Sequence, residues 1–194
     1  SLGRVDEVIV ARGGLDEARL GPNGLPGITN GYFEASEYDR LQPLMTAIPG
    51  VAGVTPAISE AVALVDVTSK QSKTNVTLIA LPANYSPAFG QLQSFAGQTE
   101  ALAALGPDQI FINRQGAMAL NAQSGDTVRL YIGSQILDTR LKAVVRNGGP
   151  GGSQPVALAP LPAIQQALGE QGQINQMYVA NQGNELSSDR WSVS

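Results

Sequence analysis

The segment INRQGAMALNAQSGDTVRLYI, residues 112–132, joins a strand end, a helical stretch, a chain reversal and a second strand. Small and apolar helix formers fill residues 115–121, which predicts a short helix directly after a strand at 109–113. The side chains expected to face the core from this helix are Ala117, Ala119 and Leu120. The unit therefore predicts a strand that passes into a helix without a long connection.

The second half of the segment predicts a turn and an amphipathic strand. Gly125 can adopt a positive φ without strain, and Asp126 can accept hydrogen bonds from nearby backbone N–H groups. In the strand at 127–132, alternation separates two sets of side chains. We expect Val128, Leu130 and Ile132 on the buried face and Arg129 and Tyr131 on the other face. Similar helix–Gly-Asp–strand units occur in double-psi barrels, so the unit alone identifies no family.

The rest of the chain alternates between strand and helix patterns. Further strands are expected at 5–11, 54–67, 75–81, 137–146, 156–159 and 174–180, and helices at 36–48 and 161–168. Ser36 is the expected N-cap of the first helix, which Pro43 should kink. Residues 82–107 are less regular and hold a short helix near 96–106, while glycine and proline at 20–31 and 147–152 indicate loops. The order predicts an α+β fold with mostly antiparallel sheets and a few helices.

Composition excludes several classes of site. The 194 residues contain no His and no Cys, which removes most catalytic triads and thiolate or histidine metal sites. Twelve basic residues face sixteen acidic ones without a basic run, so nucleic-acid binding is not expected. The sequence NGGPGG at 147–152 lacks the Gly-Lys-Ser/Thr ending of a phosphate loop and predicts a connection instead. Catalytic, cofactor-binding and metal residues are therefore predicted to be none, and binding residues stay unassigned.

Several motifs in order resemble the MacB-like periplasmic core domain of FtsX/MacB-type ABC transporter permeases. They are Ile48-Pro49-Gly50-Val51, Val54-Thr55-Pro56, the unit from Ile112-Asn113 to Leu130, the strand at 141–145 and the helix–strand at 161–180. The resemblance covers about residues 5–181. Two features depart from the family pattern: Arg114 stands where an acidic residue is usual, and KAVVRNGG forms an unusual connector.

The resemblance implies a non-catalytic domain on the extracytoplasmic side of the cell membrane. It would consist of a porter-like α/β lobe, residues 1–82 and 153–194, and a smaller inserted lobe, residues 83–152. The implied partners are the transmembrane helices of the same permease and a cytoplasmic ATPase subunit or domain, together with a second permease copy or an extracytoplasmic protein. The domain would contact substrate or a partner protein and couple that contact to transmembrane motion, with no cofactor of its own.

Two other classes stay open on sequence grounds. An extracellular carbohydrate-binding module or enzyme would need an aromatic-lined pocket, and a glycosidase would need two close carboxylates in it. An adhesive or assembly domain would need neither. No run of about 18 apolar residues is present, and the chain begins Ser-Leu-Gly, so we expect an excised soluble domain. Its parent chain should contain an apolar helix of about 20 residues shortly before Leu2, and more beyond Ser194.

Overall fold

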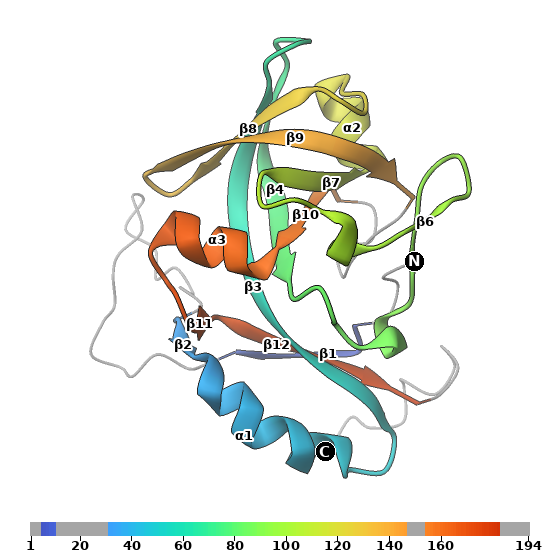
Figure 1. Ribbon diagram of the computed structural model, residues 1–194, viewed down its shortest axis with the longest axis vertical. Helices are drawn as coiled ribbons and strands as arrows, with labels where there is room; N and C mark the ends of the chain where they lie inside the picture. Colours follow the sequence, from blue (N-terminus) through green and yellow to red (C-terminus); the bar gives the residue numbers. More distant parts are fainter. Residues whose placement is uncertain (1–4, 11–30, 147–153, 183–194) are drawn as a thin grey trace, which may run out of the picture.

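The computed structural model describes residues 5–10, 31–146 and 154–182, and Figure 1 shows how their elements are arranged. The strands are β1 (Glu7–Val10), β2 (Phe33–Glu34), β3 (Val51–Asp66), β4 (Ser72–Leu81), β5 (Leu92–Gln93), β6 (Thr99–Glu100), β7 (Gln109–Asn113), β8 (Thr127–Ile132), β9 (Gln135–Val145), β10 (Val156–Pro160), β11 (Gln173–Ile174) and β12 (Gln176–Asn181). The α-helices are α1 (Ala35–Thr46), α2 (Arg114–Leu120) and α3 (Leu161–Leu168), and two 3-10 turns cover Pro87–Phe89 and Leu102–Ala104.

Six strands close into a barrel. Around the ring, β3 pairs with β4, then β10, β7, β9 and β8 follow, and β8 pairs back with β3. The pairings β4–β10 and β7–β9 are parallel, and the other four are antiparallel. The interior is filled by alternate apolar side chains of these strands, among them Ile58, Leu64, Leu78, Ile112, Leu130 and Leu141. Closure leaves this part of the sheet without open edges.

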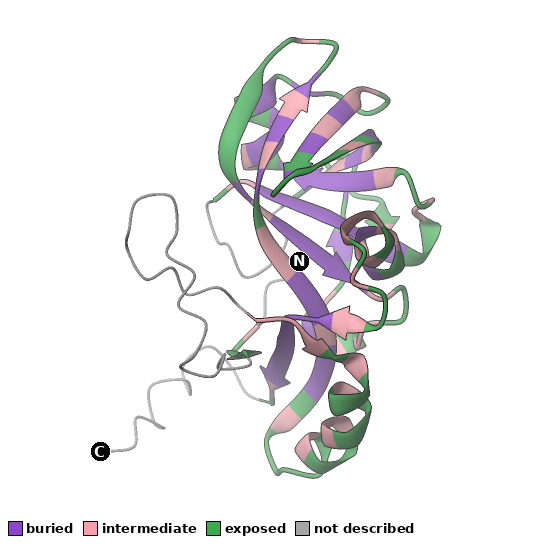
Figure 2. Cartoon of the chain, turned by 90° about the vertical axis from the view of Figure 1, so that its left-hand side faces the viewer, coloured by how far each residue is buried: buried purple, intermediate pink, exposed green. Residues whose placement is uncertain are grey.

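Strand β3 belongs to two parts of the molecule. Its second half lies in the barrel, whereas its first half pairs antiparallel with β12, and β1 adds to the far side of β12. Helix α1 packs on this smaller sheet, where Tyr38, Leu41 and Met45 are half-buried against the core. Figure 2 shows that α1 has only intermediate and exposed residues, in contrast to the buried strands of the barrel.

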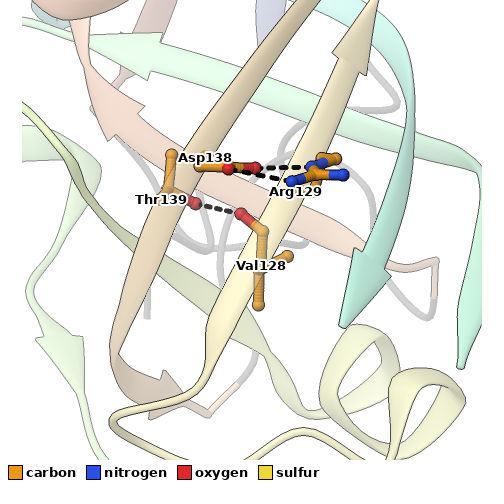
Figure 3. A network of polar contacts seen from close by, with 4 residues as sticks. All are labelled: Val128, Arg129, Asp138 and Thr139. Carbon is orange, nitrogen blue, oxygen red and sulfur yellow. Dashed lines mark hydrogen bonds and ion pairs between the residues drawn. The ribbon is translucent and has the colours of Figure 1, made fainter. Parts of the chain in front are cut away.

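The β8–β9 hairpin follows the alternation that its sequence predicts. Val128, Leu130 and Ile132 are buried, while Arg129 and Tyr131 lie on the outer face. Figure 3 shows the cross-strand contacts: the Arg129 guanidinium binds the Asp138 carboxylate at 2.6 Å, and the Thr139 hydroxyl donates to the Val128 carbonyl oxygen at 2.8 Å. The register of this hairpin is therefore fixed by burial on one face and by paired polar groups.

A second apolar cluster lies outside the barrel, beneath the segment between β4 and β7. Phe89, Leu92 and Leu102 from this segment are buried against outward-facing side chains of the sheet. The sheet contributes Ile79, Phe111, Val145, Leu158 and Tyr178, among others. A segment with little regular structure thus covers one outer face of the barrel, and its three buried side chains hold it there.

The predicted α+β class is confirmed, and most predicted elements are present. Ser36 is not the N-cap: the helix begins at Ala35, whose N–H donates to the Gly172 carbonyl oxygen at 2.7 Å, so tertiary contact supplies the cap. Ala119 was expected in the core but is exposed, since α2 is only seven residues long and its buried side carries Gly116, Ala117 and Leu120.

Other differences concern element length. The helix expected near 96–106 is one 3-10 turn after strand β6, and the last strand is split into β11 and β12. The predicted loop at 147–152 and most of the one at 20–31 lie outside the described residues.

Candidate functional site

A groove lies beside the first half of β3. Strand β4 pairs with β3 only from Ile58 onward, so the earlier part of β3 has no paired strand on that side among the described residues. Helix α1 forms one wall of the groove and residues 82–86 form the other, around a volume of about 450 Å³. The lining residues are Ala35, Tyr38, Asp39, Gln42, Val54, Thr55, Pro56, Pro82, Asn84, Tyr85 and Ser86. A volume of this size accommodates a small molecule or a few residues of a peptide.

The floor of the groove is the edge of the first half of β3, and this edge offers few backbone groups for pairing with a further strand. The Asp6 N–H donates to the Val179 carbonyl oxygen, so the backbone groups of Val179 face β1. Successive residues of a strand direct their backbone groups to opposite sides, so those of the neighbouring Tyr178 face β3, where Tyr178 exchanges hydrogen bonds with its partner Thr55. Val54 and Pro56 therefore direct their backbone groups away from β12. The Tyr38 hydroxyl donates to the Val54 carbonyl oxygen at 3.2 Å, and proline has no N–H to offer. A ligand in the groove must therefore bind to side chains more than to backbone groups.

Thr55 places an unsatisfied hydroxyl in the wall of the groove. Its side chain is 1% exposed, and its Oγ1 has no hydrogen-bond partner among the described residues. A buried hydroxyl without a partner costs about 1–3 kcal/mol.

The loop wall packs its Ser86 side chain against the backbone of β3 at Gly53. A Cβ atom at Gly53 would lie 2.3 Å from Ser86 Oγ and 2.9 Å from Ser86 Cβ, so only glycine fits there without displacement. Ser86 Oγ accepts from the Ala88 N–H, which caps the following 3-10 turn, and the Tyr85 hydroxyl donates to the Gly90 carbonyl oxygen. The position of Tyr85 and Ser86 is thus set by the chain around them.

The charged residue of the groove is Asp39, which lies on the wall formed by α1. Burial, and secondarily the nearby Asp39 carboxylate, raise the pKa of Tyr38 above its usual value. Arg40, the next residue, binds Glu37 at 2.6 Å, whereas Asp39 forms no ion pair within the described part of the chain. Two half-buried tyrosine rings, two amides and one carboxylate therefore line the site, which suits binding. The two carboxylates that a glycosidase requires are not both among the lining residues.

A second polar cluster lies at the centre of β3. The Tyr32 hydroxyl donates to Glu60 Oε1 at 2.7 Å, and the Asn175 side-chain amide donates to the same oxygen at 3.1 Å. Asn175 also exchanges two hydrogen bonds with the backbone of Ser59. Burial and the Glu60 contact raise the pKa of Tyr32 far above its usual value, so it stays neutral. This network is satisfied and joins residues before α1 to β3 and the start of β12.

The sequence named no binding residue, and nothing in it marked the groove. Its walls come from residues 35–42 and 82–86, which become neighbours only because β3 and β4 pair between them. Of the acidic pairs near the start of the chain, Asp6 accepts a hydrogen bond from the Asn181 N–H, and Asp16 and Glu17 lie outside the described residues. Among the described residues no three His, Cys, Asp or Glu side chains gather as a metal site, and no helix is long and apolar enough to span a bilayer.

No family model and no curated protein matches the sequence. Solved structures do match the fold. The extracellular domain of the noncanonic ABC-type transporter YknZ from Gram-positive bacteria has a TM-score of 0.55 at 14% identity, over 78% of this chain and 74% of that one. The periplasmic region of MacB from Actinobacillus actinomycetemcomitans has a TM-score of 0.55 at 16% identity, over 92% of this chain and 76% of that one. The chain therefore has the fold of these extracytoplasmic transporter domains, which confirms at the level of the fold the resemblance found in its sequence.

Proposed function

We propose that this chain is the extracytoplasmic domain of an ABC transporter permease and that it is not an enzyme. The observation that carries the proposal is the coincidence of the ordered sequence motifs with a fold shared by the YknZ and MacB domains. Ile48 to Val51 connect α1 to β3, and Ile112 to Leu130 form the β7–α2–β8 unit, so the motifs occupy defined junctions of that fold. A chance resemblance of short motifs would not place them in one consistent topology.

In this proposal the groove beside β3 is where the domain contacts substrate or an extracytoplasmic partner. The support is its composition: half-buried aromatic rings with a few polar groups, on a wall fixed by Gly53 and Ser86. The other partners are the transmembrane helices of the same permease, a cytoplasmic ATPase subunit or domain, and a second permease copy.

We also propose the two lobes expected from the sequence, residues 1–82 with 153–194 and residues 83–152. Hydrogen-bonded strands join the two lobes, because β10 of the first lobe pairs with β7 of the second and β3 of the first pairs with β8 of the second. The lobes would therefore share one sheet and act as parts of one folding unit.

The proposed extracytoplasmic location of this domain can be tested by cysteine labelling in the full-length parent protein, because this chain contains no Cys. Ser134→Cys places a thiol at the exposed β8–β9 turn, and Ala157→Cys places one at a fully buried position as the matched control. We expect a membrane-impermeant maleimide to label the first variant in cells with an intact inner membrane, and the second only after denaturation. Labelling of Ser134→Cys only after lysis of the inner membrane would refute the proposal.

A further inference from the structure

A surface patch away from the groove combines two apolar side chains with two arginines. We call it the Phe95 patch, and it consists of Phe95, Arg114, Met118 and Arg146. Phe95, in the β5–β6 turn, is 46% exposed, and Met118, on α2, is 70% exposed. Neither side chain is needed by the core. Aromatic residues, methionine and arginine are the types enriched where proteins bind one another.

The patch is assembled from three separate stretches of chain. An isolated bridge between Ser94 and Val145 holds the β5–β6 hairpin beside the end of β9, and Figure 1 shows α2 above them. The Arg146 N–H donates to the Gln93 carbonyl oxygen at 2.7 Å, and its guanidinium donates to the Phe95 carbonyl oxygen at 3.3 Å. Phe95 is thus presented by a hairpin that is tied to the barrel.

Arg114 lies over the exposed ring. Its guanidinium carbon is 5.6 Å from the centre of the Phe95 ring, within the range of cation–π attraction. Arg114 is the first residue of α2, and Met118 follows one turn later on the same side of the helix. The Arg114 guanidinium therefore covers the Phe95 ring, and the exposed Met118 lies on the same side of α2 as Arg114.

The two arginines of the patch have no acidic partner among the residues that the structure describes. Within residues 5–10, 31–146 and 154–182, ion pairs join Arg40 with Glu37 and Arg129 with Asp138, and neither Arg114 nor Arg146 forms one. The chain as a whole carries a formal charge of -4. Two unpaired guanidiniums around one phenylalanine are thus a local basic site on an acidic protein, and a guanidinium presents the fork of donors that matches a carboxylate.

We propose that the Phe95 patch binds an acidic segment of a partner protein, in which Asp or Glu lies next to an apolar residue. The carboxylates pair with Arg114 and Arg146, and the apolar side chain packs on Phe95 and Met118. A lipid surface fits less well, since two cations and one ring are few for stable attachment to a bilayer. The proposal adds a second partner contact, separate from the groove, and rests on the proposed function for the identity of that partner.

The test uses the 194-residue chain and an array of short synthetic peptides. In the array, Asp or Glu flank Phe or Leu at varied spacing, and each peptide has a twin with Asn and Gln in place of the acids. The best acidic peptide is then measured by fluorescence anisotropy. We expect acidic peptides to bind better than their twins, and Arg114→Glu with Arg146→Glu to weaken binding about tenfold or more. Phe95→Ser should weaken it as well.

The matched control is Lys70→Glu with Lys73→Glu at the β3–β4 turn, where both lysines are exposed. This double variant changes the net charge by the same amount and should leave binding unchanged. Equal loss in both double variants, or no preference for acidic peptides over their twins, would overturn the proposal. So would sedimentation with phosphatidylglycerol vesicles that depends on Arg114 and Arg146 while peptides fail to bind. The cysteine-labelling test does not involve this patch, so either result can fail without the other.

Discussion

The side chain of Asn113 joins three elements at the end of β7. It is 1% exposed, and its Oδ1 accepts from the Gly116 N–H at 3.0 Å and from the Val156 N–H at 2.9 Å. Its amide also donates to the Gln154 carbonyl oxygen at 2.8 Å. One residue thus caps α2 and attaches the start of β10, which explains why asparagine suits the end of this strand.

Replacing Asn113 by Ala should destabilise the chain by about 2–4 kcal/mol, because two buried N–H groups lose their acceptor. Chemical denaturation followed by circular dichroism measures the change. Asn121→Ala at the other end of α2 is a poor control, since Asn121 has a φ of 50°. Gln123→Ala, at an exposed position of the following turn, should cost far less. Similar losses in both variants would mean that the Asn113 hydrogen bonds are not the cause.

Gly125 has a φ of 98°, as its place in the turn predicts. A Cβ atom added there would meet no atom within 4 Å outside the two neighbouring residues, so we expect the penalty to come mainly from the backbone. Gly125→Val should therefore destabilise by about 1–3 kcal/mol. Gly31, which also has open space but no positive φ, is the control, and Gly31→Val should be nearly neutral. Equal free energies of unfolding for the two variants would contradict the strain argument.

At the scale of elements, the groove depends on the contact between β3 and the loop after β4. Gly53→Ala would push Ser86 and Ala88 away and should destabilise the fold, while Ser86→Gly in the same chain removes the two Ser86 atoms, leaves the Ala88 Cβ at 2.9 Å and should restore part of the loss. The free energies of the two single variants and the double variant measure this coupling. Simple additivity would show that Gly53 and the Ser86 side chain do not meet as described.

The β8–β9 hairpin contains both a buried and an exposed polar contact between its strands, so their contributions to stability can be compared. Thr139 is 4% exposed, and Thr139→Val removes the hydroxyl that donates to the Val128 carbonyl oxygen, so we expect a loss of about 1–2 kcal/mol. The Arg129–Asp138 pair is solvent-exposed, and Arg129→Gln should leave the unfolding midpoint almost unchanged. A larger effect of Arg129→Gln than of Thr139→Val would reverse this ranking.

Sequence reasoning succeeded where the signal is local. The alternation at Val128, Leu130 and Ile132 has the period of a strand, and the structure buries all three. It failed at Ser36 because the N–H of Ala35 is satisfied by Gly172, far along the chain. Closure of the barrel through β3–β8, and the parallel pairing of β4 with β10, depend on partners that no local pattern specifies. The groove was missed for the same reason.

At the scale of the whole molecule, the shared sheet predicts a single unfolding transition. The proposed lobes are joined by the strand pairings β10–β7 and β3–β8, so neither lobe can lose its strands without exposing the apolar side chains of the other. Differential scanning calorimetry should show one peak, with calorimetric and van't Hoff enthalpies in agreement. Two resolved peaks would mean that the lobes fold separately.

Alkaline pH should also destabilise the fold. Burial raises the pKa of Tyr178 from 10.0 to about 12, so the folded state favours the neutral phenol. The stability that this residue contributes is complete below pH 10 and is lost as the pH rises through 12. Tyr178→Phe should therefore weaken the dependence of unfolding free energy on pH in this range. An unchanged slope would show that Tyr178 titrates normally.

The length of β3 has a mechanical consequence. Its sixteen residues extend for about 50 Å, and hydrogen bonds fix it to β12 at one end and to the barrel at the other. The regular pairing of β3 with β4 is interrupted between Val62 and Leu64, so we expect β3 to bend most easily at this point. Among the described strands only β3 is paired in both the small sheet and the barrel, so we expect a displacement of α1 and the small sheet to reach the barrel through β3.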